Sequence, residues 1–332
     1  MSTVLVTGGA GYIGSHTCKA LARAGYRPVA YDNMVYGHAQ AVKWGPLEQG
    51  DILDAARLSE VIKASGARAV IHLAAFAYVG ESVADPAKYY RNNVAGTLTL
   101  LEAMRDCGMD RIVFSSTCAT YGVPDMLPIT EETPQRPVNP YGASKLMIER
   151  ILADYQRAYG LKSVALRYFN AAGADPDGEL GEDHNPETHL IPLVLDAASG
   201  RRPHIAIFGD DYDTADGTCV RDYIHVSDLA NAHVLALRGL ENETLRRNAY
   251  NLGTGQGHSV ASVLHAAKQV TGRNIPVVKG PRRAGDPAVL LADPSRAKAD
   301  LGFSPDFPRI EDMLLSAWRW SIRKNGPLSG AA

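Results

Sequence analysis

Tyr141 and Lys145 are four residues apart and carry side chains that can exchange a proton with a hydroxyl group. Asn139 is a favoured N-cap and Pro140 suits the first helical position, so a helix is predicted to begin here. Side chains four residues apart share a helix face. A nearby ammonium favours the phenolate, which would let the tyrosine act as acid and base toward a sugar or alcohol. A solvated tyrosine beside a solvated lysine is the alternative, and other motifs must decide between them.

A glycine-rich turn near the N-terminus has the spacing that can hold a dinucleotide. A β-rich run over Thr3–Thr7 leads directly into Gly8, Gly11 and Gly14, and a helix is predicted over 15–24. Glycines permit a tight turn and a close approach of the backbone to a pyrophosphate, which the helix N-terminus faces with unpaired N–H groups. Strand, turn and helix occur in the required order, which favours a cofactor loop over a merely glycine-rich one.

Acidic residues follow the next two predicted strands. Asp32 ends the second strand, where a carboxylate can bond both ribose hydroxyls and would repel a 2′-phosphate, so NAD is favoured over NADP. Asp51 and Ile52 follow the third short strand and could border the adenine. A turn aspartate is an equally good interpretation of Asp51.

Strands and helices alternate through the first half of the chain. Strands are predicted over 70–73, 111–114 and 164–167, with a long helix over 86–107. This order predicts an α/β fold with a doubly wound parallel sheet, in which ligands bind at the carboxyl ends of the strands. Ala74 and Ala75 follow one strand and leave room for a cofactor.

The amino-acid composition changes after Asn170, where Gly, Pro and Asp become frequent. We expect this part of the chain to form a lid over the substrate. We therefore expect a NAD-binding domain over 1–170 that takes back a segment at about 223–256. A smaller α/β substrate-binding domain, interleaved in sequence, would comprise 171–222 and 257–325.

The composition limits the classes of protein to be considered. The chain has 332 residues, of which 45% are hydrophobic and 21% are charged, as in ordinary globular proteins. The net charge of -2 gives no reason to expect nucleic acid or an anionic membrane as a partner. Four dispersed cysteines predict neither disulfides nor a structural zinc. Without a signal-like leader or a run of roughly 20 apolar residues, we expect a cytoplasmic protein.

A histidine-containing segment was also considered as a metal site. His184 and His189 lie near Glu182, Asp183 and Glu187. Their spacing matches no familiar ligand pattern, so we interpret the segment as a polar loop and expect no metal.

Taken together, the glycine turn, Asp32, Thr117 and the Tyr141–Lys145 pair resemble those of the extended short-chain dehydrogenase/reductase superfamily, whose fold is a Rossmann-type doubly wound sheet. Within it, the segments 11–17, 79–82, 167–170 and 216–226 resemble those of UDP-glucose 4-epimerases, and the similarity runs from Leu5 to about Trp320.

The resemblance implies an isomerase that interconverts UDP-glucose and UDP-galactose through a transient 4-keto sugar and a bound NAD. Tyr141 would be the acid and base at the 4-hydroxyl, and Lys145 would lower its pKa and hold the nicotinamide ribose. Thr117 replaces the family's serine and keeps the hydroxyl that can bond the 4-oxygen. A homodimer is implied, formed by the helices around 86–107 and 140–159.

The other site residues follow from the same resemblance. The implied cofactor positions are Gly8, Gly11, Tyr12, Ile13, Gly14, Asp32, Asn33, Asp51, Ile52, Leu73, Ala74, Ala75, Asn93, Ser115, Tyr141, Lys145 and Tyr168. The implied UDP-sugar positions are Thr117, Asn170, His189, Leu190, Phe208, Arg221, Arg283, Asp286 and Leu290. Arg221 and Arg283 suit a diphosphate because guanidinium groups bind phosphate oxygens bidentately.

Two departures leave alternatives open. Several family members have a lysine near the pyrophosphate, and Ala77 occupies that position here. Leu290 occupies the position that often determines how large a sugar the site accepts. The segments 75–80 and 116–122 also resemble UDP-xylose/UDP-arabinose 4-epimerases. A nucleotide-sugar 4,6-dehydratase would need an acid–base pair where Cys118 and Ala119 stand. A non-catalytic NAD-sensing protein need not keep Tyr141 and Lys145.

Overall fold

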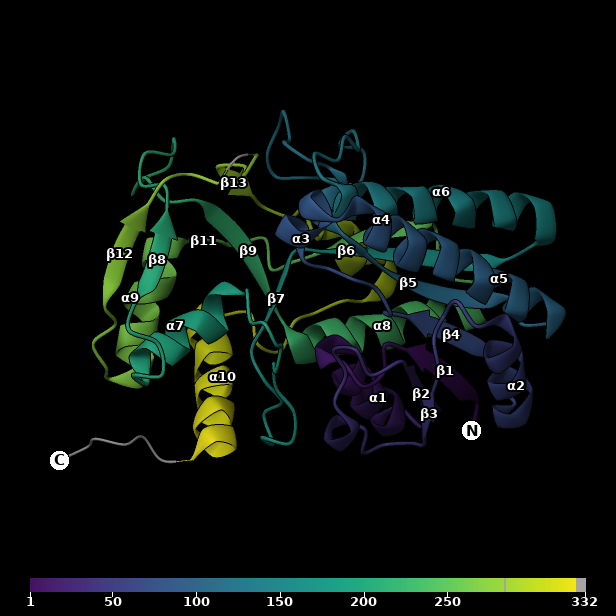
Figure 1. Cartoon of the computed structure of the whole chain (residues 1–332). Coiled ribbons are helices and arrows are strands. Elements are labelled where there is room, and N and C mark those ends of the chain that lie inside the picture. Colours follow the sequence, from purple (N-terminus) through teal and green to yellow (C-terminus); the bar gives the residue numbers. More distant parts are fainter. Residues whose placement is uncertain (284, 327–332) are drawn as a thin grey trace.

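A seven-stranded parallel sheet forms the larger half of the molecule (Figure 1). The computed structural model describes residues 1–283 and 285–326. The strand order is β10-β6-β5-β4-β1-β2-β3, in which the chain reverses direction across the sheet between β1 and β4. The predicted doubly wound sheet is therefore confirmed. Its strands are β1 (Thr3–Thr7), β2 (Arg27–Asp32), β3 (Leu47–Gln49), β4 (Ala69–His72), β5 (Arg111–Thr117), β6 (Lys162–Tyr168) and β10 (Ala249–Leu252).

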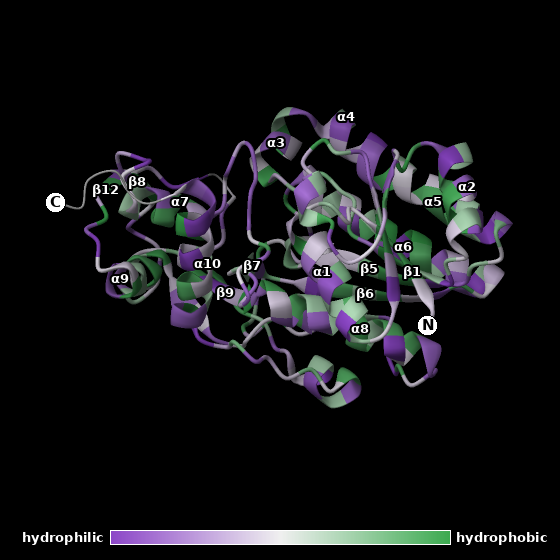
Figure 2. Ribbon diagram, turned by 90° about the horizontal axis from the view of Figure 1, so that it is seen from below, coloured by the Kyte–Doolittle hydropathy of each residue, from purple (hydrophilic) through white to green (hydrophobic). Residues whose placement is uncertain are grey.

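Helices cover both faces of this sheet, because successive residues of each strand point to opposite sides. Val4 and Val6 of β1 belong to one core with α1 and α8, whereas Leu5 belongs to a second core with α2, α5 and α6. Figure 2 shows hydrophobic residues concentrated around β1, β5 and β6. The flanking helices are α1 (Tyr12–Arg23), α2 (Ala55–Ser65), α5 (Gly96–Asp106), α6 (Pro140–Tyr159) and α8 (Val226–Glu241).

The predicted helix over 86–107 forms in three consecutive pieces. A π-helical stretch, η2 (Tyr90–Ala95), joins the short α4 (Pro86–Tyr89) to α5. The shorter α3 (Val79–Ala84) precedes them, and α3, α4 and η2 pack against α6. The π-helical stretch turns Asn93 into the interior, where its side chain is buried. Short 3₁₀ turns lie at η1 (Ala39–Ala41) and η3 (Cys118–Thr120).

The remaining elements form two small sheets at the other end of the molecule (Figure 1). One joins β7 (Asn170–Ala172), β9 (Val220–His225), β11 (Gly257–Ser259) and β13 (Val289–Leu290), and the other pairs β8 (Ile205–Phe208) with β12 (Val277–Gly280). A third core packs against them, formed by α7 (Leu190–Ala198), α9 (Val260–Thr271) and α10 (Ile310–Asn325). A second π-helical turn, η4 (Ala297–Leu301), packs on α8.

No helix in residues 1–283 and 285–326 is both long enough and apolar enough to cross a membrane.

Candidate active site

The glycine turn after β1 brings three backbone segments into contact. Gly8 has a φ of +72°, and a Cβ at Gly8 would lie 2.7 Å from the backbone nitrogen of Ala74. A Cβ at Gly14 would lie 2.0 Å from the carbonyl oxygen of Gly8. Within the described residues no side chain caps α1, and its first turn holds no acidic residue. The turn therefore fits a pyrophosphate, which the unpaired N–H groups of α1 would face.

The acidic positions after β2 and β3 lie at the same edge of the sheet. The Asp32 carboxylate accepts hydrogen bonds from the backbone nitrogens of Ala10, at 3.0 Å, and Met34, at 2.9 Å. Burial raises the pKa of Asp32, and these backbone bonds oppose the shift. The Asn33 amide donates to Asp51 at 3.1 Å. The side chain of Ile52 is instead in the core, so only its backbone is free to contact a ligand.

Asn93 holds the loop that follows β4. Its side-chain oxygen accepts from the backbone nitrogen of Phe76 at 2.9 Å, and its amide nitrogen donates to the Phe76 carbonyl at 3.0 Å. The same nitrogen donates to Ser144 Oγ at 3.2 Å. Both amide donors are thus used, and Asn93 fixes the Leu73–Ala75 stretch beside α6.

Tyr141, Lys145 and Thr117 come together where β5 and β6 end and α6 begins. Asn139 caps α6 by accepting from the Gly142 nitrogen at 2.8 Å, so the predicted helix start is confirmed. The Tyr141 hydroxyl contacts the Thr117 side chain. Lys145 Nζ donates to the Ser115 carbonyl at 2.8 Å.

Ser115 and Tyr168 complete this group from the same strand ends. Ser115 Oγ and the Tyr168 hydroxyl lie 2.7 Å apart. The cofactor and catalytic positions predicted from the sequence therefore meet along the carboxyl edge of the sheet, next to the glycine turn.

Burial sets the protonation of the Tyr141–Lys145 pair. It raises the pKa of Tyr141, and a nearby Tyr168 adds to the shift, while the contact with Thr117 opposes it. Burial also lowers the pKa of Lys145 to about 7. The Lys145 ammonium is directed to the Ser115 carbonyl.

A buried ion pair beneath this group was missed by the sequence interpretation. Arg167 on β6 and Glu149 on α6 are 2.5 Å apart, and each side chain is less than a tenth exposed. Glu149 also accepts from Ser116 Oγ at 2.5 Å, and Arg167 donates to the Tyr121 hydroxyl at 2.9 Å. The available signal was the position of Glu149 one helical turn after Lys145, on the same face.

The predicted UDP-sugar residues of the small sheets meet in pairs. Arg221 on β9 forms an ion pair with Asp286 and lies opposite Leu290 of β13. The Arg283 guanidinium lies 4.2 Å from the centre of the Phe208 ring. Arg221 is close enough to Cys118, next to Thr117, to affect its pKa. The Arg221 group therefore adjoins the catalytic group, and Asn170 begins the neighbouring strand β7.

Lys88 lies near Ala77, the position where several family members have a lysine. Its ammonium is 4.1 Å from the centre of the Phe76 ring, next to Ala77, and is paired with Glu81 at 2.6 Å. Its charge is thus largely neutralised by Glu81.

The histidine segment is a polar loop, as we expected, but its ionisable side chains are partly buried and lie together. The side chains of Glu182, His184, Glu187 and His189 converge, and their ligand atoms lie within 4.8 Å of one another. His189 and Leu190 begin α7, but the Nδ1 atom of His189 faces the two glutamates. Only its other nitrogen is free to contact a substrate.

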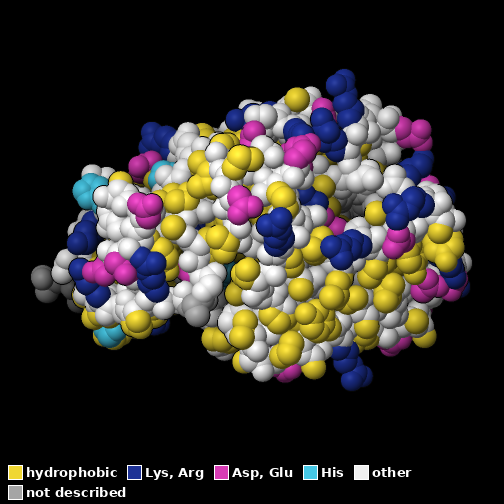
Figure 3. Space-filling view, turned by 90° about the horizontal axis from the view of Figure 1, so that it is seen from above, with side chains coloured by type: hydrophobic (Ala, Val, Ile, Leu, Met, Phe, Trp, Pro, Cys, Tyr) yellow, Lys and Arg dark blue, Asp and Glu magenta, His cyan; other side chains and the backbone are white. Residues whose placement is uncertain are grey.

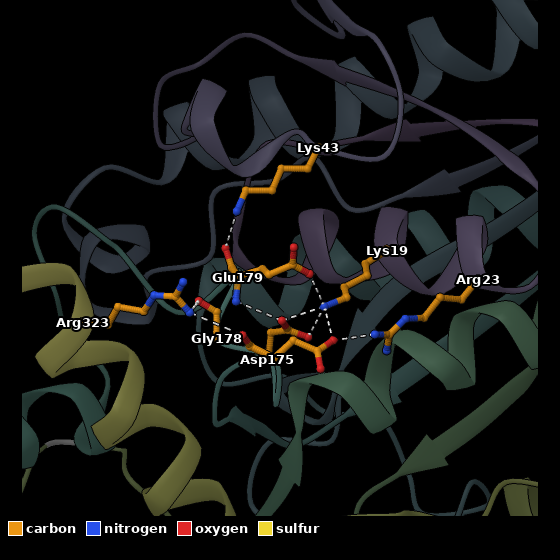
Figure 4. A network of polar contacts seen from close by, with 8 residues as sticks. Lys19, Arg23, Lys43, Asp175, Gly178, Glu179 and Arg323 are labelled. Carbon is orange, nitrogen blue, oxygen red and sulfur yellow. Dashed lines mark hydrogen bonds and ion pairs between the residues drawn. The ribbon is translucent and has the colours of Figure 1, made fainter.

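A second charged group ties α1 to the segment after β7 (Figure 4). Lys19 donates to Asp175 at 2.7 Å, to Asp177 at 2.8 Å and to Glu179 at 2.6 Å. Arg323 of α10 donates to backbone carbonyls of the same segment. The cofactor helix and the substrate side of the molecule are therefore joined by a buried cation.

A parallel doubly wound sheet with these residues at its carboxyl edge defines a class, that of Rossmann-fold enzymes which act on a bound sugar or alcohol. Residues 4–253 match the NAD dependent epimerase/dehydratase family, and the chain belongs to it. Over 327 residues it is 53% identical to the UDP-glucose 4-epimerase of Rhizobium leguminosarum bv. trifolii, a match that covers 97% of this chain and 98% of that protein. Within the family it therefore belongs to the UDP-glucose 4-epimerases.

Solved structures support the same grouping. The UDP-glucose 4-epimerase from Brucella ovis in complex with NAD superposes with a TM-score of 0.93 at 55% identity, covering 96% of this chain and 98% of that one. The enzyme from Bifidobacterium longum in complex with NAD+ and UDP gives a TM-score of 0.91 at 42% identity, covering 98% and 99%.

Proposed function

We propose that this chain interconverts UDP-glucose and UDP-galactose by inverting carbon 4 of the sugar, with NAD as its cofactor. The observation that carries the proposal is that Tyr141 and Lys145 of α6 lie with Thr117 at the carboxyl edge of the sheet, where Lys145 bonds the end of β5 beside the glycine turn. Relatives that cover nearly the whole chain are UDP-glucose 4-epimerases.

The cofactor would be held by backbone groups of the glycine turn and by Asp32. NAD, when bound, accepts a hydride from carbon 4 and returns it to the opposite face of the sugar. The close backbone approach at Gly8 and Gly14 leaves no side chain between the turn and a pyrophosphate. Lys145 contacts the end of β5 and Tyr168 lies at the end of β6, on the same edge of the sheet as the glycine turn.

Tyr141 would accept the proton of the 4-hydroxyl and later give it back. Because burial raises the pKa of Tyr141, a positive charge must come close to it before it can act as a base at neutral pH. Lys145 and the oxidised nicotinamide are both cations suited to that role. The Thr117 hydroxyl would hold the 4-oxygen in line with Tyr141.

Arg221 and Arg283 would bind the diphosphate of the UDP-sugar. Arg221 is kept in place by Asp286, and Arg283 lies against the Phe208 ring, so both guanidinium groups are positioned in advance. Asn170, His189, Leu190 and Leu290 would complete the sugar and nucleotide contacts. We assign this role to 171–222 and 257–325, and cofactor binding to 1–170 with 223–256.

We also propose a homodimer in the cytoplasm. Apolar side chains remain exposed on the helices expected to pair, among them Leu98, Met147 and Tyr159. Figure 3 shows hydrophobic side chains gathered on this side of the molecule, over its right half. A two-fold contact would bury this surface.

The test is product analysis by NMR on the purified chain without added cofactor. We expect UDP-glucose and UDP-galactose to interconvert while the chain retains NAD. Formation of a 4-keto-6-deoxy sugar would show instead that the chain is a dehydratase. Turnover of UDP-xylose/UDP-arabinose alone would show that it is a pentose epimerase. A chain that binds NAD but converts no UDP-sugar would be a non-catalytic NAD-binding protein.

A further inference from the structure

Two histidines and two glutamates after β7 form a ring of potential metal ligands. Nδ1 of His184 lies 3.2 Å from Glu182 Oε1 and 3.6 Å from Glu187 Oε2. Nδ1 of His189 lies 2.6 Å from Glu182 Oε1 and 3.3 Å from Glu187 Oε1. Each imidazole nitrogen therefore faces both carboxylates.

The nitrogen–oxygen separations are close to those around a tetrahedral metal ion, but they involve both oxygens of Glu187, and one ligand atom from each of the four residues lies within 4.8 Å of the others. Ligand atoms placed 2.0–2.2 Å from a zinc ion at the corners of a tetrahedron are about 3.3–3.6 Å apart. Three of the four nitrogen–oxygen distances lie within about 0.1 Å of that range. Only the contact of His189 with Glu182 is shorter, and a small rotation of the half-exposed His189 ring would lengthen it.

Two atoms of the ring are buried without a hydrogen-bond partner among the described residues, Glu182 Oε1 and His184 Nδ1. The Glu182 side chain is only 7% exposed. Both atoms belong to the ion-pair ring itself, because Glu182 Oε1 lies 3.2 Å from His184 Nδ1 and 2.6 Å from His189 Nδ1. Burial alone would lower the pKa of the two imidazoles, but the glutamates raise it to about 9 for His184 and about 10 for His189, so a metal ion would bind here by displacing the imidazole protons.

The neighbouring acidic group provides a contrast. Asp175, Asp177 and Glu179 also converge, but the ammonium of Lys19 already lies between them. No lysine or arginine of the described chain is paired with Glu182 or Glu187. In the ring formed by Glu182, His184, Glu187 and His189 the partners of the carboxylates are imidazoles, which can give up their protons and become metal ligands, as an ammonium group cannot.

We propose that Glu182, His184, Glu187 and His189 together bind one divalent transition-metal ion of the zinc type. Imidazole nitrogens favour such ions over magnesium or calcium, and the two carboxylates balance the charge. The site shares His189 with the proposed substrate contacts: Nδ1 would bind the metal and the other ring nitrogen would remain for the substrate.

The ion would fix a segment that borders the cofactor turn. The His184 ring packs edge-on against Tyr12 and Tyr78, and Tyr78 donates to the Pro186 carbonyl at 3.1 Å. His38 contacts the Asp183 carbonyl at 2.6 Å. Coordination would lock this segment against residues from three separate parts of the cofactor-binding half.

The test measures zinc on the full-length, tag-free protein with its cofactor. After dialysis against zinc and then against metal-free buffer, mass spectrometry of the metal should find about one zinc per chain, with a bound ion raising Tm. The double variant His184→Asn/Glu187→Gln should weaken zinc binding by at least ~100-fold and lose the Tm increase. His265→Asn, which removes an exposed histidine of α9, should retain both.

Two results would overturn the proposal. One is wild-type protein that holds no zinc and whose Tm does not respond to the ion. The other is zinc binding that survives in the double variant. If the double variant does not fold, the isosteric Glu187→Gln alone serves as the variant, and the wild-type measurement needs no variant.

Discussion

The ammonium of Lys145 donates a hydrogen bond to the carbonyl oxygen of Ser115, 2.8 Å away at the end of β5. This bond fixes the lysine between the strand and α6. Burial disfavours the charged forms of both Tyr141 and Lys145. We therefore expect a nearby positive charge, from Lys145 or from the bound nicotinamide, to be needed before Tyr141 can act as a base.

Replacing Tyr141 by Phe should remove activity while NAD stays bound. The phenol is the proton acceptor of the proposed reaction, and general acid–base catalysis contributes about 10²–10⁴-fold to rate. NAD would be held by separate contacts at the glycine turn and Asp32. The checks are the epimerase rate and the NAD released on denaturation. Tyr155→Phe on the same helix should keep both, and a Tyr141→Phe enzyme with near-normal rate would contradict the assignment.

Replacing Lys145 by Met should change how stability depends on pH. The folded pKa of Lys145 is about 7 and its ordinary value is 10.5, so between these values the unfolded chain binds one more proton. Wild-type stability should therefore gain on the variant as pH rises through this window, by about 1 kcal/mol per pH unit. Below pH 7 the difference should stay constant.

Denaturant unfolding from pH 6 to pH 9.5 in saturating NAD measures this difference. Other titrating groups are common to both proteins and cancel in the comparison. A difference that is flat across the window would mean that Lys145 is not desolvated as the structure indicates.

Much of this site could be predicted from the sequence because its parts are local. The Asn139 cap, the Tyr141–Lys145 spacing and the glycine turn each depend on residues within a few positions of one another. Parallel strands bring their carboxyl ends to one edge, so the cofactor positions that follow each strand could also be placed together.

The parts that were missed depend on contacts between distant segments. Glu149 on α6 meets β6, where Arg167 offers a buried partner that the sequence places 18 residues away. The convergence of Glu182 and His189 depends on how the chain folds back before α7, which residue spacing alone does not encode.

Replacing Asp32 by Ser should shift cofactor preference toward NADP. The carboxylate would repel a 2′-phosphate, so its removal should raise NADP binding relative to NAD by ~10-fold, or ~1.4 kcal/mol. Some stability should be lost, since Asp32 accepts from two backbone nitrogens. Reconstitution with each cofactor measures the ratio. Asp51→Ser is the control, because both cofactors share the adenine. An unchanged ratio of NADP to NAD binding in Asp32→Ser would contradict the role of Asp32 in cofactor preference.

Placing charge on the exposed apolar helices should separate the proposed dimer. Leu98 on α5 and Met147 on α6 are both more than a third exposed in the single chain. Leu98→Glu/Met147→Glu should halve the mass measured by light scattering at micromolar concentration, because buried like charges are costly. Val277→Glu on the distant β12 is the control. A wild-type chain that is already monomeric would contradict the proposed dimer.

Leu290 determines the final prediction, which concerns the range of sugars. The sugar must turn over between the two hydride transfers, so its pocket needs free volume. Leu290 lies opposite Arg221 and packs against the small core that contains Cys118, next to Thr117. It has no polar atom to bond an N-acetyl group. We therefore expect UDP-glucose and UDP-galactose to be accepted and N-acetylated sugars to react poorly.

UDP-xylose and UDP-arabinose should react well, because losing a hydroxymethyl group costs only about 1–3 kcal/mol in an apolar pocket. Leu290→Ala should open this wall and raise kcat/KM for UDP-N-acetylglucosamine about 10-fold relative to UDP-glucose. Leu291→Ala, directly after β13, is the matched control, because it removes the same side-chain atoms from the next residue along the chain. If the wild type already prefers the N-acetylated sugar and Leu290→Ala gains nothing, another residue sets the size of the pocket.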